Sequence, residues 1–113
     1  MYLKKLEISG FKSFANKTVL DFLPECNIVD GGTCGITAIV GPNGSGKSNV
    51  AEAFRFALGE QSMKSMRGKR SEDLIFAGSH ESARANRASV AIIFDNTKKI
   101  FPNLEYDEVS VER

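Results

Sequence analysis

Residues 41–48 read GPNGSGKS, and this stretch decides the fold. It meets the pattern G-x-x-x-x-G-K-[ST] in full, in which glycines let successive backbone N–H groups turn inward and form an anion-binding nest. Lys47 would place a compact positive charge between the β- and γ-phosphates of a nucleoside triphosphate. Ser48 would offer its hydroxyl to the Mg²⁺ ion that bridges the same phosphates. The stretch therefore predicts a loop that binds the phosphates of a magnesium-bound nucleotide.

The segments on either side of this loop have the order that a phosphate-binding unit requires. Residues 36–40 read ITAIV, a β-branched and almost continuous apolar run typical of a strand buried on both faces of a parallel or mixed sheet. Residues 47–58 carry one apolar stripe at helical spacing, and Gly59 stands where a left-handed residue would end the helix. Strand, glycine loop and helix together supply the context that a genuine motif of this kind needs.

Alternating or continuous apolar residues predict four further strands. A loop rich in Gly, Asn and Asp at residues 25–35 and a turn at residues 96–99 interrupt them. We therefore expect an α/β fold, with a mixed sheet around residues 36–40, the helix packed on that sheet, and an antiparallel lobe made by the other strands. Those strands are residues 2–9, 18–22, 89–95 and 108–113.

The composition is that of an ordinary globular domain, with 113 residues, 42% hydrophobic and 26% charged. The net charge of +1 gives no global field toward nucleic acid or an anionic membrane. No apolar run resembles a signal peptide or approaches the roughly 20 residues of a membrane span, so we expect a cytoplasmic protein without membrane contact. Cys26 and Cys34 are expected to be plain thiols, since a cytosolic disulfide is rare and a zinc site would need two more ligands.

Five stretches, in one order, resemble the N-terminal head segment of SMC proteins, the ATPases that organise and segregate chromosomes. The match is best with the bacterial chromosome-partition SMC proteins, and it covers nearly the whole chain. The stretches are FKSF at residues 11–14, GPNGSGKSN at 41–49, LGEQS at 58–62, KSMRG at 64–68 and DLIFAGS at 73–79.

The resemblance implies one half of an ABC-type P-loop ATPase head. Residues 1–113 would be its N-terminal lobe, truncated at the C-terminus. A C-terminal segment, beyond two coiled-coil arms and a hinge, would supply the signature motif and the Walker B acid. Two heads would sandwich two ATP molecules as a homodimer on DNA, with accessory partition subunits, at the nucleoid. The chain alone would then bind Mg-ATP but hardly hydrolyse it, because half a site cannot stabilise the transferred phosphoryl group.

The same resemblance assigns roles to particular residues. Lys47 and Arg67 would be catalytic, with Arg67 acting at the interface between heads and sensing DNA. Lys12 and Ser13 would lie near the nucleotide, and Ser48 would help to hold Mg²⁺. The expected nucleotide-binding residues of the loop and the helix start are Gly41, Pro42, Asn43, Gly44, Ser45, Gly46, Lys47, Ser48 and Asn49.

The chain departs from the family pattern in two ways. Residues 23–35, which contain both cysteines, form a longer segment than the family usually has, and we assign it no function. No signature motif or Asp-Glu pair behind an apolar run is present. Gln61 is not assigned to magnesium, because the family's glutamine would lie beyond Arg113.

Two other functions stay open. Asp95 ends an apolar strand, which is the form of a Walker B acid, and the chain could then be a small self-contained P-loop NTPase. Asp95 could equally begin the turn that follows, where Asp is common. Residues 64–70 carry four basic and no acidic side chains, which would suit a DNA-binding module. The plainer interpretation of that run is a solvated face.

Overall fold

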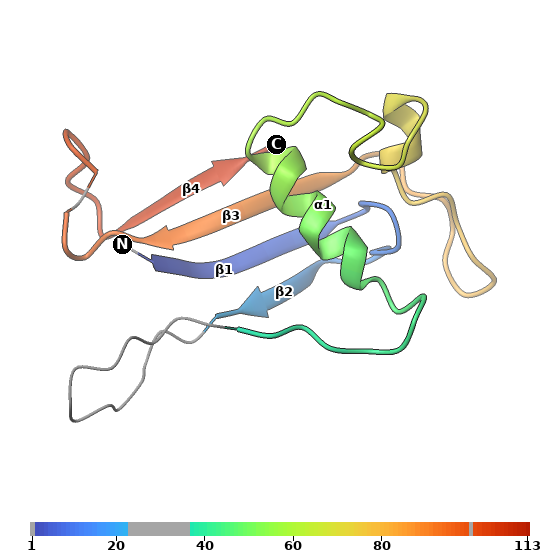
Figure 1. The fold of residues 1–113 in the computed structure, drawn as a ribbon, viewed down its shortest axis with the longest axis horizontal. Helices are drawn as coiled ribbons and strands as arrows, with labels where there is room; N and C mark the ends of the chain where they lie inside the picture. Colours follow the sequence, from blue (N-terminus) through green and yellow to red (C-terminus); the bar gives the residue numbers. More distant parts are fainter. Residues whose placement is uncertain (1, 23–36, 100) are drawn as a thin grey trace.

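The structure is a computed structural model that describes residues 2–22, 37–99 and 101–113 (Figure 1). The strands among these residues form one four-stranded sheet of order β2-β1-β3-β4, and every pairing is antiparallel. All four strands lie where the sequence predicts them. The bounds are β1 Tyr2–Ser9, β2 Thr18–Asp21, α1 Lys47–Ala57, the 3-10 helix η1 Ser71–Leu74, β3 Ser89–Asp95 and β4 Glu108–Glu112.

The sheet buries one face, which explains the alternation in the sequence. Leu6 of β1 pairs with Leu20 of β2 and with Ile92 of β3, and Leu6 and Ile92 are both buried. The alternation of β1 breaks at its start because the register against β3 shifts between Leu3 and Lys5. One extra residue on the β1 side lets two consecutive lysines fit a strand that still presents a single apolar face.

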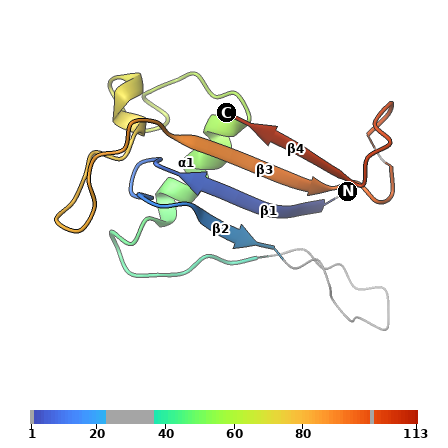
Figure 2. The same cartoon turned by 180° about the vertical axis from the view of Figure 1, so that it is seen from behind.

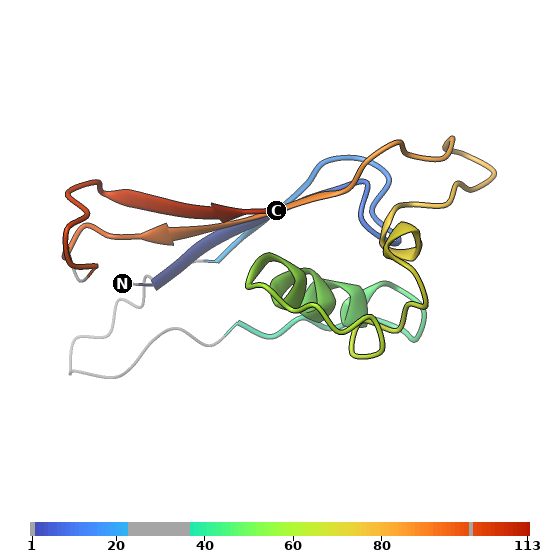
Figure 3. The ribbon, with the colours of Figure 1, turned by 90° about the horizontal axis from the view of Figure 1, so that it is seen from above.

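Helix α1 covers one face of the sheet and leaves the other face open (Figures 2 and 3). Val50, Ala53 and Ala57 of α1 are buried in the same cluster as Leu6 and Ile92 of the sheet. Such burial of apolar area is the main term that stabilises the pairing of helix and sheet.

The end of α1 differs slightly from the prediction. The helix stops at Ala57, and Leu58, expected on the apolar stripe, caps it with its side chain 65% exposed. Gly59 then adopts φ 99°, the left-handed residue expected there. Arg113 donates to the carbonyl oxygens of Phe56 and Glu60 at 3.1 and 3.0 Å, which ties the helix end to the residue after β4.

The predicted strand at residues 36–40, and with it the mixed sheet, is not found. Residue 36 lies outside the described residues, and residues 37–40 have no strand structure and are all exposed. Val40 is 87% exposed. A buried strand needs neighbours on both sides to satisfy its backbone groups, and no described strand pairs with this run. Helix α1 therefore packs on the antiparallel sheet instead.

The chain between β1 and β2 is pinned at one end of the sheet. Gly10 has φ 64°, and a Cβ there would lie 2.2 Å from the carbonyl oxygen of Arg87, so only glycine fits. The backbone N–H of Phe76 donates to Gly10 O at 2.7 Å, and that of Lys12 donates to Leu74 O at 2.8 Å. These bonds place the FKSF stretch beside η1.

The remaining sequence predictions fall partly outside the described residues. The turn expected at residues 96–99 is present, since the N–H of Lys99 donates to Asn96 O at 2.9 Å. Cys26 and Cys34 lie outside the described residues. Within the described ranges, no helix is long and apolar enough to cross a membrane.

Candidate phosphate-binding site

The glycine loop leads directly into α1 through two left-handed residues. Gly44 has φ 83°, and Gly46, the N-cap of α1, has φ 96°. Other residue types adopt such angles only with strain, which explains why glycine occupies both positions. Ser45 closes the turn, because its N–H and its Oγ both donate to Pro42 O, at 3.2 and 2.7 Å.

The N-terminus of α1 faces the space that this loop encloses. Gly46 offers no side chain to cap the helix, and the first turn of α1 holds no acidic residue. Unpaired N–H groups at a helix start favour an anion, and the helix dipole acts in the same direction. The loop and the start of α1 therefore form a site that attracts negative charge.

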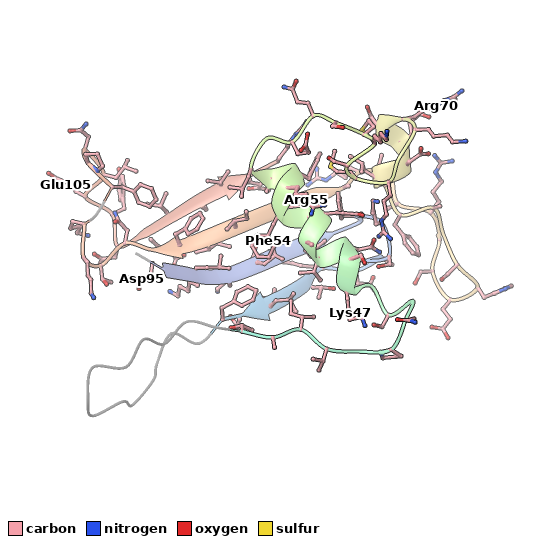
Figure 4. All side chains as sticks on the ribbon, viewed as in Figure 1. Lys47, Phe54, Arg55, Arg70, Asp95 and Glu105 are labelled. Atoms are coloured by element: carbon pink, nitrogen blue, oxygen red, sulfur yellow. The ribbon has the colours of Figure 1, made fainter. Side chains whose placement is uncertain are left out.

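A cavity of about 270 Å³ opens at this point. Lys47 stands at the start of α1, beside the loop (Figure 4), and its Nζ donates to Gly41 O. Ser48 is exposed in the same place. The site offers backbone N–H groups, one ammonium group and one hydroxyl group. These groups fit a phosphate chain with its Mg²⁺ ion. The lining residues are Asn43, Gly44, Gly46, Lys47, Ser48, Asn49 and Arg67.

Two residues from distant parts of the chain contact the first turn of α1. Asn49 Nδ2 donates to Ser13 Oγ at 2.8 Å, and Arg67 Nη2 donates to Asn49 Oδ1 at 2.9 Å. The Ser13 hydroxyl also lies against Gly46, where a Cβ would approach Ser13 Oγ to 3.1 Å. The structure therefore brings Ser13 and Arg67 to the start of α1, and the roles that the family resemblance gives them toward a nucleotide or a second head stay predictions.

Beneath this layer lies a carboxylate that the sequence analysis missed. Glu52, on α1, is 3% exposed and pairs with Arg67 through Oε1 and with Lys12 through Oε2. Lys12 Nζ also donates to Met66 O. Lys12 is one step removed from the cavity, since Glu52 and Met66 occupy its ammonium group. The sequence holds no signal that would assign Glu52: it is the only acid within α1, and the FKSF and KSMRG stretches carry basic residues and no acid, but nothing in the sequence pairs them.

Charge compensation sets the state of Glu52. Burial raises the pKa of the Glu52 carboxyl, but the hydrogen bonds and charges of Arg67 and Lys12 outweigh that effect and leave the pKa below its usual value. Glu52 is therefore ionised at neutral pH.

Asp95 lies far from the cavity. It ends β3, and its partner in β1 is Tyr2, whereas Ser89 at the other end of β3 pairs with Ser9, next to the FKSF stretch. Figure 4 shows Asp95 at the left of the sheet, well apart from Lys47 at the start of α1. Asp95 Oδ1 accepts hydrogen bonds from Thr97 N and Oγ1 at 3.0 and 2.7 Å. Asp95 therefore begins the turn, as the plainer interpretation expected, and it does not line the phosphate cavity.

The loop, the helix and the cavity have the form of the P-loop class of proteins. Comparison with known families is more specific: residues 2–113 match the model of the RecF/RecN/SMC N terminal domain. The chain belongs to this family.

The curated relatives that this chain matches are much longer than the chain. It is 54% identical over all 113 residues to the chromosome partition protein Smc of Lactiplantibacillus plantarum and 48% identical to that of Bacillus subtilis. In both cases the whole chain is covered, and it spans 9% of the relative's length.

Solved SMC heads share the fold. One head, bound to the C-winged helix domain of ScpA, is 47% identical with a TM-score of 0.86, and the match covers all of this chain and 32% of that one. A second head, derived from Pyrococcus furiosus, carries an extended coiled coil and is bound to the C-terminal domain of ScpA. It is 47% identical with a TM-score of 0.85, over 98% of this chain and 25% of that one.

Proposed function

We propose that this chain binds Mg-ATP through residues 41–49 as the N-terminal lobe of an SMC ATPase head. The observation that carries this proposal is the left-handed Gly44 and Gly46 before α1, with Lys47 and Arg67 at the same cavity. The backbone nest and helix start would hold the phosphates, and Lys47 would exchange its bond with Gly41 O for a phosphate oxygen. Ser48 would be a ligand of Mg²⁺, which neutralises the charge between the phosphates.

Hydrolysis would need more than this lobe. Among the described residues, none of those lining the cavity carries a carboxylate, so the lobe offers no base for the attacking water. A C-terminal head segment would supply the Walker B acid and a second head the signature motif, as part of a homodimer. The similarity to chromosome partition proteins supports ATP over GTP, because the phosphate loop itself does not read the base.

The cellular role would be ATP-driven chromosome organisation and segregation in the cytoplasm, at the nucleoid. The solved heads bound to ScpA support an accessory partition subunit as one partner of this chain. DNA would be the other partner, with coiled-coil arms joining the two segments of the head. Arg67 at the cavity edge would link nucleotide, second head and DNA.

Mg-ATP binding and turnover by the purified chain, with Lys47→Ala as the control, test this proposal. We expect binding that Lys47→Ala weakens by at least about a hundredfold, because the ammonium contacts two phosphates. Turnover should stay near background until a C-terminal head segment is added. Equal binding by Lys47→Ala would refute the site. Steady turnover by the chain alone would refute the need for a second segment.

A further inference from the structure

Three segments that are remote in sequence meet at one carboxylate. Glu52 lies in the second turn of α1, Lys12 follows β1, and Arg67 belongs to the KSMRG stretch. Each oxygen of the carboxylate has its own cation: Oε1 pairs with Arg67 and Oε2 with Lys12. The two cations therefore share the single carboxylate of Glu52.

Burial differs sharply among the three side chains. The side chains of Glu52 and Lys12 are 3% and 11% exposed, whereas that of Arg67 is 59% exposed. Glu52 and Lys12 thus form a fixed ion pair below the surface, and Arg67 extends from that pair to the cavity. A solvent-exposed arginine without such an anchor would sample many rotamers, and ordering it on a ligand would cost entropy.

The two contacts of Arg67 also fix the orientation of its guanidinium group. Nε donates to Glu52 and Nη2 donates to Asn49 Oδ1, so the plane of the group is held at two points. The donors on Nη1, and the second donor on Nη2, lie in the same plane along another edge of the group and suit a phosphate oxygen. Asn49 itself is held by Ser13, which adds a second support.

We infer that Glu52 is a positioning residue, which, with Lys12 as its buried counter-charge, holds Arg67 at the edge of the phosphate cavity for contact with the nucleotide. This inference rests on the proposed function. Glu52 touches no phosphate in this arrangement and acts only through Arg67. Lys12 acts through Glu52, because its ammonium is already occupied by that carboxylate and by Met66 O.

A double-mutant cycle on Mg-ATP binding by the full-length protein tests this inference. Arg67→Ala should weaken binding about tenfold, the usual effect of one charge-assisted contact. Glu52→Gln, which keeps the shape but removes the charge, should weaken binding by a similar factor. The double variant should bind no more weakly than Arg67→Ala alone, because both changes remove the same contact. The exposed Glu81→Gln serves as the matched control and should bind like wild type.

Two results would overturn the inference. One is wild-type affinity in Glu52→Gln, and the other is a double variant weakened by the product of the two factors, about a hundredfold. A loss in Glu81→Gln equal to that in Glu52→Gln would also overturn it, since net charge and not contact would then matter. If wild type fails to bind, or Lys47→Ala binds equally well, the proposed function itself fails.

A second variant covers the case in which Glu52→Gln does not fold, as judged by circular dichroism and thermal unfolding. Glu52→Gln combined with Lys12→Met removes both buried charges together and leaves no unpaired ammonium behind. This variant also releases Arg67, so the same tenfold loss is expected. If the variant with both substitutions folds and binds Mg-ATP with wild-type affinity, the positioning role is refuted.

Discussion

Glu52 occupies a position where a carboxylate would normally be neutral or absent. Its side chain is 3% exposed, and burial alone would raise the pKa of its carboxyl group. The two cations reverse that tendency, so the charge is retained at neutral pH. Removing one member of such a group is expected to cost far more than the group contributes as a whole, because the remaining charges lose their partner.

The Glu52 pKa makes the stability of the protein depend on pH in a defined direction. Because the folded pKa lies below the ordinary value of 4.5, ionised Glu52 stabilises the fold at higher pH. That contribution is lost as the pH falls below 4.5 and through the folded pKa. We expect Glu52→Gln to be less stable at neutral pH by about 2–4 kcal/mol, and to lose less stability than wild type on acidification.

Urea unfolding of both proteins, at about pH 7 and at steps down to about pH 3, measures this difference. Glu60 and Asp73, whose pKa values are also lowered, are present in both proteins, so their effects cancel in the comparison. Parallel pH profiles would contradict the assigned role of the Glu52 charge.

At the scale of elements, a strand could be predicted from sequence where its own hydrophobic pattern indicates which residues are buried. β1, β2, β3 and β4 all follow alternation or continuous apolar runs that depend on their own residues. The run at residues 37–40 has the same apolar character, but whether it is buried depends on which strands lie beside it, and a local pattern does not contain that information.

The site shows the same division between local and distant information. The phosphate loop and the start of α1 could be predicted because a motif of eight consecutive residues specifies them. The expectation that Ser13 lies near the nucleotide came only from resemblance to a family, and that resemblance placed Arg67 at the interface between heads, not against Asn49. Glu52 could not be assigned at all, because its partners lie forty residues before it and fifteen after it. An ion pair of this span leaves no periodic trace in the sequence.

The position of Asp95 on β3 gives a prediction that separates the two nucleotide-binding hypotheses. Successive residues of a strand advance about 3.3 Å, so Asp95 lies roughly 20 Å along β3 from the end that adjoins the phosphate site. Asp95→Asn should therefore leave Mg-ATP affinity within about twofold of wild type. Titration of the purified variant with Mg-ATP, and again with EDTA present, is the measurement. Loss of magnesium-dependent binding would restore the self-contained NTPase hypothesis.

At the scale of the whole molecule, the functional residues gather at one end of the sheet (Figure 1). The FKSF stretch, the phosphate loop and the KSMRG stretch all lie near one end of α1 or beside η1, while the chain between β3 and β4 turns at the far end. The basic run at residues 64–70, which precedes η1, also contains exposed side chains. Lys64, Lys69 and Arg70 are exposed, and Arg70 points outward in Figure 4.

These three residues, and not the net charge of +1, should control any contact with DNA. Each Lys or Arg that neutralises a phosphate releases a counterion, so the affinity falls steeply as salt rises. We expect weak binding of the full-length protein to duplex DNA at about 50 mM salt, falling at least about tenfold at about 200 mM. Replacing Lys64, Lys69 and Arg70 together with Ala should weaken the low-salt binding and flatten its salt dependence.

Fluorescence anisotropy with a labelled duplex measures both effects, and Mg-ATP binding in the same samples shows whether the phosphate site stays intact. Since the three side chains make none of the contacts that hold Arg67 to Glu52 and Asn49, ATP affinity should not change. Absence of DNA binding by the wild type at low salt would assign the basic residues to an ordinary solvated face. An unchanged salt slope in the triple variant would place the DNA contact on another surface of the protein.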